Sequence, residues 1–276
     1  MDPIASRVGW ADFGDFEHFG VRLYRDLAGR VSYLQMVVFA LGAGLLDPED
    51  AAVLDDVASC CHVADPRIWP LKLARIVASA GRAITGHLAA CVVLDGDFIG
   101  AHAAEAAALL LSEAHRRVGH LGDAEAAPIL AELFAGLAAP PGFGLQARRE
   151  DERVAALRTC LERRGRLVRP HWRVAEGLWR AGRSERGAEP NVFGAVAAAC
   201  LDLGLGAPQI GALTAMFLQP SLLANAYDGA ALRSPGLETR PELFVEYTGA
   251  PPRRSPRALA AAREREPEAD LTRSGG

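Results

Sequence analysis

The chain has 276 residues, half of them hydrophobic, and a formal net charge of −4. This charge balance gives no electrostatic reason to expect nucleic acid or an anionic membrane surface as a partner. The longest apolar run, residues 31–46, contains Gln35 and is shorter than the about 20 residues that a membrane helix needs. No apolar leader begins the chain, so we predict a cytoplasmic protein without a membrane span.

Two further features of the composition exclude several classes of enzyme. Lys72 is the only lysine among the 30 basic residues, so no P-loop is present, and the motifs GxGxxG, HExxH and GxSxG are absent as well. The number of cysteines is odd and no two form a CxxC pair, which favours a reducing compartment over a disulfide framework or a zinc site. We therefore predict no bound metal. The five cysteines are Cys60, Cys61, Cys91, Cys160 and Cys200.

Apolar residues recur at helical spacing along most of the chain. This spacing predicts helices over residues 21–46, 48–61, 71–94, 101–118, 124–138, 151–164, 170–181, 192–203, 208–217 and 220–232. Asp47 as N-cap and Pro48 at the first helical position mark the start of the second helix. No stretch alternates polar and apolar residues for long enough to predict a strand. We therefore expect an all-α fold.

Three segments predict irregular structure. Residues 183–190 are polar and predict a loop, and the Pro-, Arg- and Glu-rich sequence after Gly249 predicts a mobile tail over 250–276. Gly142 and Gly144 predict a tight turn before a helix. Such a turn is a good position for a catalytic side chain, yet the residue after the second glycine is Leu145, which can neither donate nor accept a proton.

Five stretches carry a resemblance to a known family. They are LDGDFIGAHAAEAAALL (94–110), PGFGLQARREDERVAAL (141–157), EPNVFGAVAAACLDLGLGAPQIGAL (189–213), AMFLQPSLLANAYD (215–228) and RPELFVEYTG (240–249). In this order they resemble the motifs of the citrate synthase superfamily, including its short citryl-CoA lyase-like members. The first half of the chain adds a compatible helical pattern.

The resemblance implies an all-α, citrate synthase-like fold with a large and a small helical domain. We expect residues 1–140 to form the first part of the large domain, residues 141–224 to form the small domain and residues 225–249 to return to the large one. Family members dimerise through packed helices, so we expect a homodimer or a heterodimer with an active citrate synthase-like chain. The resemblance implies no resident cofactor, but a coenzyme A thioester and a 2-oxo acid as possible ligands.

The family joins the methyl carbon of an acyl-CoA to the carbonyl of a 2-oxo acid, with a carboxylate as base and histidines that stabilise the developing charge. When these roles are carried over position by position, the general base falls on Phe193 and the histidine of the turn on Leu145. The arginine after that histidine falls on Gln146. A second histidine of the family falls on Ile99 or Gly100, depending on the alignment. A third falls on Asn225. The resemblance therefore implies that every proton-transfer position is apolar or neutral.

Other polar residues remain as candidates for a site. His102 lies two or three residues past one of the expected histidines and is the candidate catalytic residue, and the alternative is a helix-start histidine with solvent or capping contacts. The candidate substrate-binding residues are Arg67, Gln146, Arg148, Asn191 and Arg240. Arginines at these positions can hold a carboxylate or a phosphate through paired hydrogen bonds, or belong to solvated structural faces.

Two functions follow from these residues. In the first, the chain has lost the family's condensation and acts as a non-catalytic binding or regulatory subunit. In the second, it is a repurposed acyl-CoA-dependent acyltransferase or lyase, with catalytic residues that have moved to new positions. An apolar side chain at the position of the base favours the first function, and the retained glycine turn favours the second.

Overall fold

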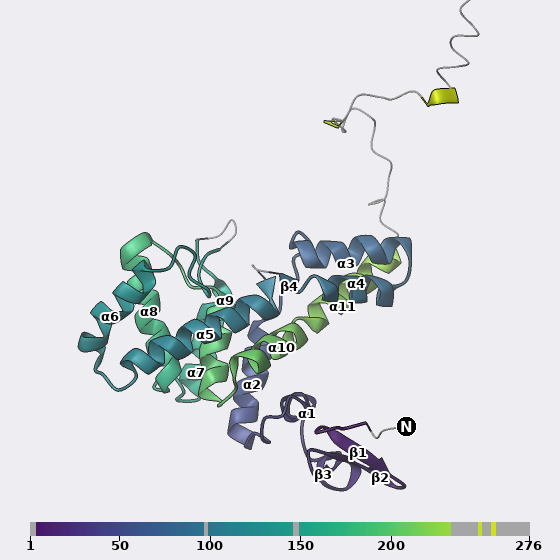
Figure 1. Cartoon of the computed structure of the whole chain (residues 1–276), viewed down its shortest axis with the longest axis horizontal. Helices are drawn as coiled ribbons and strands as arrows, with labels where there is room; N and C mark the ends of the chain where they lie inside the picture. The colour runs from purple at the N-terminus through teal and green to yellow at the C-terminus, as the bar shows by residue number, and fades with distance from the viewer. Residues whose placement is uncertain (1–3, 97–98, 146–148, 233–247, 250–254, 258–276) are drawn as a thin grey trace, which may run out of the picture. The chain divides into compact units, whose positions relative to one another are not determined.

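The computed structural model describes residues 4–96, 99–145, 149–232, 248–249 and 255–257. The chain divides into two compact units, Met1–Leu237 and Glu238–Gly276, and nearly all described residues belong to the first. This unit is built mainly of α-helices (Figure 1), so the all-α prediction is confirmed. Among the described residues, no helix is long and apolar enough to cross a membrane. Most of the predicted tail lies outside the described residues.

The helices follow one another with short connections. In the described part of the chain they are α1 (Tyr33–Ala40), α2 (Pro48–Cys60), α3 (Trp69–Ala80), α4 (Ala83–Val92), α5 (Ala101–Val118), α6 (Asp123–Ala135), α7 (Glu152–Arg163), α8 (Pro170–Arg186), α9 (Val192–Asp202), α10 (Ala207–Phe217) and α11 (Gln219–Leu232). Helix α2 begins as predicted, because the Asp47 side chain accepts a hydrogen bond from Asp50 N at 2.8 Å and Pro48 takes the first position. Helix α8 is longer than predicted and includes part of the expected loop 183–190.

The segment before α1 differs from the prediction. The strands β1 (Gly9–Asp12), β2 (Asp15–His18) and β3 (Val21–Arg22) form an antiparallel sheet, and a π-helix, η1 (Leu23–Leu27), follows. A second small sheet pairs β4 (Asp95–Gly96) with β5 (Ile99–Gly100). The expectation of a helix over 21–46 and of no strands is therefore wrong. Strands this short alternate too briefly to be recognised, and Gly20 and Gly29, with φ of +79° and +73°, interrupt the helical pattern.

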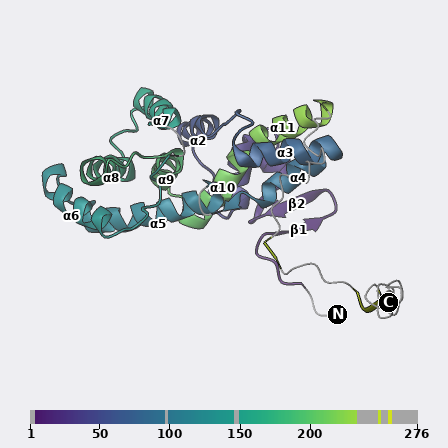
Figure 2. The ribbon, with the colours of Figure 1, turned by 90° about the horizontal axis from the view of Figure 1, so that it is seen from above.

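The main hydrophobic core surrounds α5, which packs against α8, α9 and α10 (Figure 2). Trp172, Phe134 and Phe217 are among its largest fully buried side chains. The rings of Trp172 and Trp179 meet edge to face, with their centroids 5.3 Å apart. Aromatic side chains bury a large area and prefer this geometry, so they hold the helices of this core in fixed relative positions.

A second hydrophobic cluster lies where α3, α4 and α11 pack together (Figures 1 and 2). Its buried residues are mostly small or aliphatic, and glycines set the spacing between the helices. A Cβ atom on Gly86 would lie 2.3 Å from Ala74 O, and one on Gly229 would lie 2.6 Å from the Cα of Arg75. These distances are too short for any side chain, so the helix backbones touch only because both positions are glycine.

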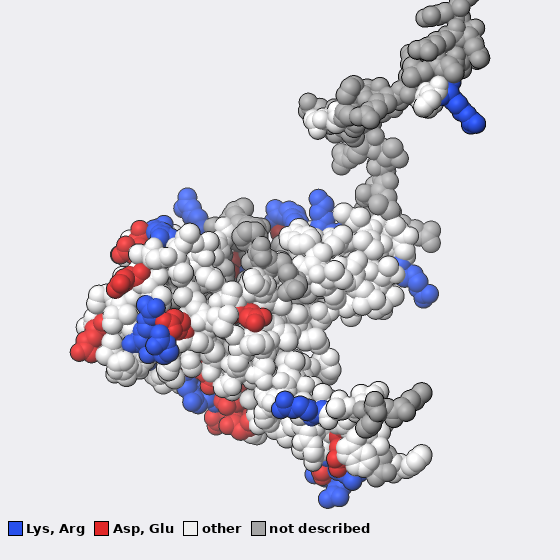
Figure 3. Space-filling model, in the orientation of Figure 1, with Lys and Arg blue, Asp and Glu red and all other residues white. Residues whose placement is uncertain are grey.

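The charged residues do not gather into one basic surface on the face shown in Figure 3. Acidic and basic side chains are interspersed there. Exposed ion pairs of the chain include Arg116 and Arg117 with Glu113. The part of this face formed by α3 and α4 carries few charges (Figure 3). This distribution agrees with the near-neutral charge balance of the sequence.

Candidate functional site

The glycine turn, residues 141–145, has a fixed main-chain conformation. Gly142 and Gly144 have φ of +83° and +88°, a region that only glycine adopts without strain. Gly144 N donates to Glu189 O at 2.9 Å, and Asn191 N donates to Gly142 O at 2.9 Å. The turn is therefore paired with the segment that leads into α9.

Asn191 joins this turn to the first residues of α9. Its side-chain oxygen accepts from Phe193 N at 3.1 Å and from Gly194 N at 3.3 Å, which caps the helix. Its side-chain nitrogen donates to Phe143 O at 3.0 Å. Both ends of the amide thus contact main-chain atoms. Sequence reasoning missed this contact because the turn lies more than 40 residues earlier. The assignment of Asn191 to a substrate remains a prediction.

The main chain of the glycine turn also packs closely against two helices, α9 and α5. A Cβ atom on Gly194 would lie 2.8 Å from Gly142 O, and one on Gly142 would lie 3.3 Å from the Cβ of Ala107. The glycine turn, the first turn of α9 and the middle of α5 therefore meet at one place. Gly194 is required there, since a larger residue would push the turn away from α9.

Asp151, the N-cap of α7, ties this helix to α9. Its side chain is 1% exposed and holds Arg153 through two hydrogen bonds of 2.8 Å. It also accepts from Val192 N at 2.8 Å, the amide at the start of α9. Burial alone would raise the pKa of the Asp151 carboxyl, but Arg153 and the two main-chain amides lower it to below its usual value. The carboxylate is therefore charged and structural.

Two of the positions that the resemblance assigns to acid–base chemistry are close to this junction, and a third lies on α11. Phe193, in the first turn of α9, is 6% exposed and belongs to the main core. Leu145 is the last residue of the glycine turn and is half-buried. Neither side chain has an atom that can bind or release a proton. Asn225, on α11, is buried, and its side chain donates to Ser221 O at 3.0 Å.

His102 lies at the start of α5, five residues before Ala107, and its side chain is exposed. The helix begins after Gly100, whose φ is +86° and where a Cβ atom would lie 2.1 Å from Leu94 O. His102 is thus on the same helix that contacts the glycine turn. Its catalytic role remains a prediction.

The predicted arginines are dispersed or lie outside the described residues. Arg67 is 88% exposed and binds Asp65, with the shortest contact 2.6 Å. This pair lies before α3. Gln146, Arg148 and Arg240 lie outside the described residues.

A second buried carboxylate, Asp202, lies at the end of α9 and caps α8. Its two oxygens accept from His171 N at 2.8 Å and Trp172 N at 3.0 Å, and His171 Nδ1 lies 3.0 Å from Oδ1. The ring of His115 stacks on His171 with centroids 4.3 Å apart. Burial, and then the neighbouring His171, lower the pKa of His115. In the described part of the chain, no group of three or more His, Cys, Asp and Glu residues is arranged to hold a metal ion.

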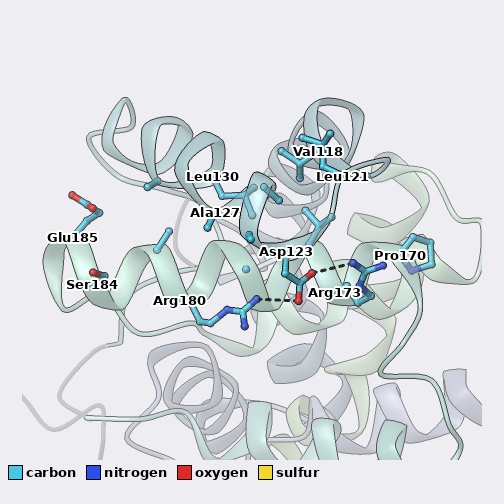
Figure 4. A pocket seen from close by; sticks show the side chains of 17 residues that line it. Val118, Leu121, Asp123, Ala127, Leu130, Pro170, Arg173, Arg180, Ser184 and Glu185 are labelled. Atoms are coloured by element: carbon cyan, nitrogen blue, oxygen red, sulfur yellow. Dashed lines mark hydrogen bonds and ion pairs between the residues drawn. The ribbon is translucent and has the colours of Figure 1, made fainter.

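A cavity of about 510 Å³ lies between α6 and α8 (Figure 4). Its lining is largely apolar, with Ala127 and Leu130 on one side. At its rim, Asp123 lies 3.0 Å from Arg173 and 3.9 Å from Arg180. No residue of the glycine turn lines this cavity, and neither does any sequence-predicted site residue that the structure describes.

No family model matches the sequence, and no curated protein matches it. Solved structures do match. Citryl-CoA lyase from Hydrogenobacter thermophilus aligns with a TM-score of 0.78 and 22% identity, over 93% of this chain and 99% of the lyase chain. Citrate synthase from Thermoplasma acidophilum aligns with a TM-score of 0.55 and 18% identity, over 81% of this chain and 58% of the synthase.

A third match is a larger enzyme. ATP citrate lyase from Methanothrix soehngenii, solved with citrate and coenzyme A, aligns with a TM-score of 0.71 and 16% identity. The match covers 94% of this chain but 43% of the lyase. At these identities the similarity shows the fold, and this chain has the citrate synthase-like fold that its motifs predict.

Proposed function

We propose that this chain, folded like citryl-CoA lyase and citrate synthase, is a non-catalytic member of that group that acts as a binding or regulatory subunit. The observation that supports the proposal is Phe193. Its buried ring lies at the start of α9, at the position where the resemblance expects a general base. A phenyl ring cannot accept a proton at any pH.

The expected loss of rate is large. General acid–base catalysis contributes about 10²- to 10⁴-fold at each group. Leu145 replaces a second polar group at the glycine turn, beside the same helix. The family's reaction passes through an enolate. With both positions apolar, the chain lacks the base that forms this enolate and the histidine of the turn that stabilises its charge.

We propose that the ligand is a coenzyme A thioester, with or without a 2-oxo acid. The retained backbone of the glycine turn supports this, because Gly142, Gly144 and Asn191 keep a well-defined surface next to α5 and α9. The structural similarity to an enzyme solved with citrate and coenzyme A is consistent with such a ligand. The cytoplasm is the compartment that fits this ligand and the cysteine usage.

The test measures binding and turnover on the same preparation of the full chain. Calorimetry with acetyl-CoA and with oxaloacetate measures binding, while thiol release and citryl-CoA cleavage measure turnover in both directions. We expect heat of binding for the thioester and no turnover above the buffer rate. Turnover by the unmodified chain would overturn the non-catalytic proposal, and the absence of binding would overturn the choice of ligand.

Restoring the missing groups sharpens this test. The double variant Leu145→His with Phe193→Asp places an imidazole at the turn and a carboxylate at the start of α9. If these are the lost positions, the double variant gains turnover, while Leu145→His alone does not. Circular dichroism of both variants checks that the fold is retained, because Phe193 belongs to the core.

A second candidate is a repurposed acyltransferase or lyase that uses His102. The observation in its favour is the exposed position of His102 at the start of the helix that contacts the glycine turn. If the chain turns over a CoA thioester, His102→Ala lowers kcat by at least about 10²-fold. His120→Ala is the matched control, since His120 is also exposed and lies beyond the other end of α5.

We propose that the partner packs against α4. Ile84, Leu88 and Val92 recur every fourth residue and are 53%, 57% and 79% exposed. The opposite face carries Gly86 and Ala90, which are buried against α3. Helix α4 has no Asp, Glu, Lys or Arg, and its one histidine, His87, is half-buried, so an antiparallel copy of the same helix would meet mainly apolar side chains. A homodimer is therefore the first expectation, and a heterodimer with an active citrate synthase-like chain is the alternative.

A further inference from the structure

Helices α2 and α7 lie side by side and run in opposite directions. Asp56 of α2 binds Arg164, just after α7, with Nε 2.5 Å from Oδ2. Asp50, earlier on α2, lies 2.9 Å from Nη2 of Arg166, later in the chain. A step toward the start of α2 is therefore matched by a step further along the chain past the end of α7. Two ion pairs fix this antiparallel register.

The same register brings two cysteines together. Cys60 lies one helical turn after Asp56 on α2, and Cys160 lies one helical turn before Arg164 on α7. Residues four apart lie on the same face of a helix, so these thiols are the next pair along the seam. Cys160 is also among the groups that raise the pKa of Cys60, as expected for neighbours along this seam. Both side chains are half-buried at the protein surface.

The two thiols have different surroundings. Arg163 Nη2 donates to Cys160 Sγ at 3.1 Å, which places a cationic group beside this sulfur. Burial, together with Cys160 and Asp56, raises the pKa of Cys60 to about 11. Cys60 therefore stays protonated at neutral pH, next to a sulfur that has a cationic neighbour.

Cys61, the next residue, is not an alternative partner. It is 1% exposed and lies beside Cys200, which is fully buried in the main core. Burial raises the pKa of Cys61 far above its usual value. It is therefore sheltered from solvent oxidants and stays a thiol.

We infer that Cys60 and Cys160 form a reversible oxidation site, in which a disulfide joins α2 to α7 when the protein meets a peroxide. In the first step the Cys160 thiolate attacks one oxygen of hydrogen peroxide, the O–O bond breaks, and a sulfenic acid and hydroxide result. In the second step the Cys60 sulfur attacks the sulfenic sulfur. The S–O bond breaks, and the hydroxide that leaves takes the Cys60 proton to form water. Two thiols are oxidised, and one peroxide is reduced to two waters.

The bridge would act close to the candidate site. Helix α7 starts at Asp151, whose carboxylate holds Val192 N, one residue before Phe193. A bond from α7 to α2 restrains the helix that carries this contact. A site of this kind suits a reducing compartment, where disulfides are transient and act as signals of redox state.

The experiment uses the full chain, reduced and freed of the reductant, then exposed to hydrogen peroxide and blocked with N-ethylmaleimide. Trypsin releases Cys160 in residues 159–163 and Cys60 in residues 31–67. We expect these two peptides to be linked, and dithiothreitol to release them. The bridge closes a loop of about 100 residues, so the thermal midpoint rises by on the order of 5 °C on oxidation.

Single serine variants identify the cysteines. Cys160→Ser and Cys60→Ser abolish the link, while Cys61→Ser and Cys91→Ser leave its yield unchanged. Cys91 is the matched control, because it is also half-buried but lies on α4. The inference is overturned if the link persists in Cys60→Ser, or if peroxide converts Cys160 to a sulfinic acid without any linked peptide. Circular dichroism of each variant establishes that it is folded before it is scored.

Discussion

The core around α5 and the cluster formed by α3, α4 and α11 hold their helices together by different means. The main core uses large side chains, with Trp172, Phe134 and Phe217 fully buried between helices. The second cluster uses small ones, so its helices approach until main-chain atoms meet at Gly86 and Gly229. The first arrangement depends on side-chain volume, and the second depends on the absence of a Cβ atom.

The two regions also differ in how deeply their polar contacts are buried. In the main core Asp151 and Asp202 are buried carboxylates, and each accepts a main-chain amide from the start of a neighbouring helix. In the second cluster the ion pair of Arg75 with Asp228 lies at the surface, with the Asp228 side chain 54% exposed. The main core is thus closed by its own contacts, whereas the second cluster leaves the outer face of α4 uncovered. A helix group of the second kind is suited to contact a partner.

The largest expected effect is at Asp151. Asp151→Ala leaves the Arg153 guanidinium without its carboxylate and α7 without its cap, so the free energy of unfolding falls by about 3 kcal/mol. The matched control is Asp228→Ala, which removes an exposed ion pair and costs about 0–1 kcal/mol. Urea denaturation of both variants measures the difference. Equal losses would mean that burial does not separate the two regions as described.

Next comes Gly86→Ala, which tests the close approach in the second cluster. The added methyl group would lie 2.3 Å from Ala74 O, so α4 must move away from α3. We expect a loss of about 2 kcal/mol in the free energy of unfolding, since overpacking of this kind typically costs 1–3 kcal/mol. In Gly136→Ala, the control at the end of α6, the new Cβ would meet atoms no closer than 3.6 Å. If Gly86→Ala is as stable as that control, the second cluster has room that the structure does not show.

A smaller effect is expected from pH. The pKa of Asp151 is lower in the folded chain than in the unfolded one, where it is about 3.9. Its contribution is therefore complete above the unfolded pKa and is lost as the pH falls through the folded one. Asp151→Asn removes this dependence. The stability difference between the unmodified chain and the variant should be constant from about pH 7 to 5 and shrink below about pH 4. A difference that does not change with pH would show that charge is not what Asp151 contributes.

The smallest change in unfolding free energy is expected for Leu88→Glu, on the exposed face of α4. A surface substitution usually changes stability by less than about 0.5 kcal/mol. Association should respond instead, because the charge would be buried between two apolar faces. Sedimentation of the unmodified chain should show a dimer and that of the variant a monomer. Glu125→Gln, on α6, is a surface control that leaves the association unchanged. A dimer that survives Leu88→Glu would assign the contact to another face.

The sequence predicts the parts of this structure that depend on near neighbours. The start of α2 is predicted correctly because Asp47 caps an amide three residues away. The roles of Asp151 and Asp202 are not predicted, since their partner amides are 41 and 31 residues distant. The N-terminal sheet is missed because its strands have at most four residues. Phe193 and Leu145 are identified by their motifs, but only the packing of the glycine turn against α9 and α5 shows that the two positions belong to one junction.

The glycine turn has one consequence for how such proteins diverge. The hydrogen bonds that hold its shape come from main-chain atoms and from Asn191, so they do not involve the side chain of residue 145. A mutation at that codon can therefore remove a reactive group at little cost to the frame that presented it. The requirements of folding alone are enough to preserve the turn, whichever side chain stands at residue 145. The presence of such a turn therefore indicates the fold of a protein. The side chain at residue 145 decides whether that position can take part in proton transfer.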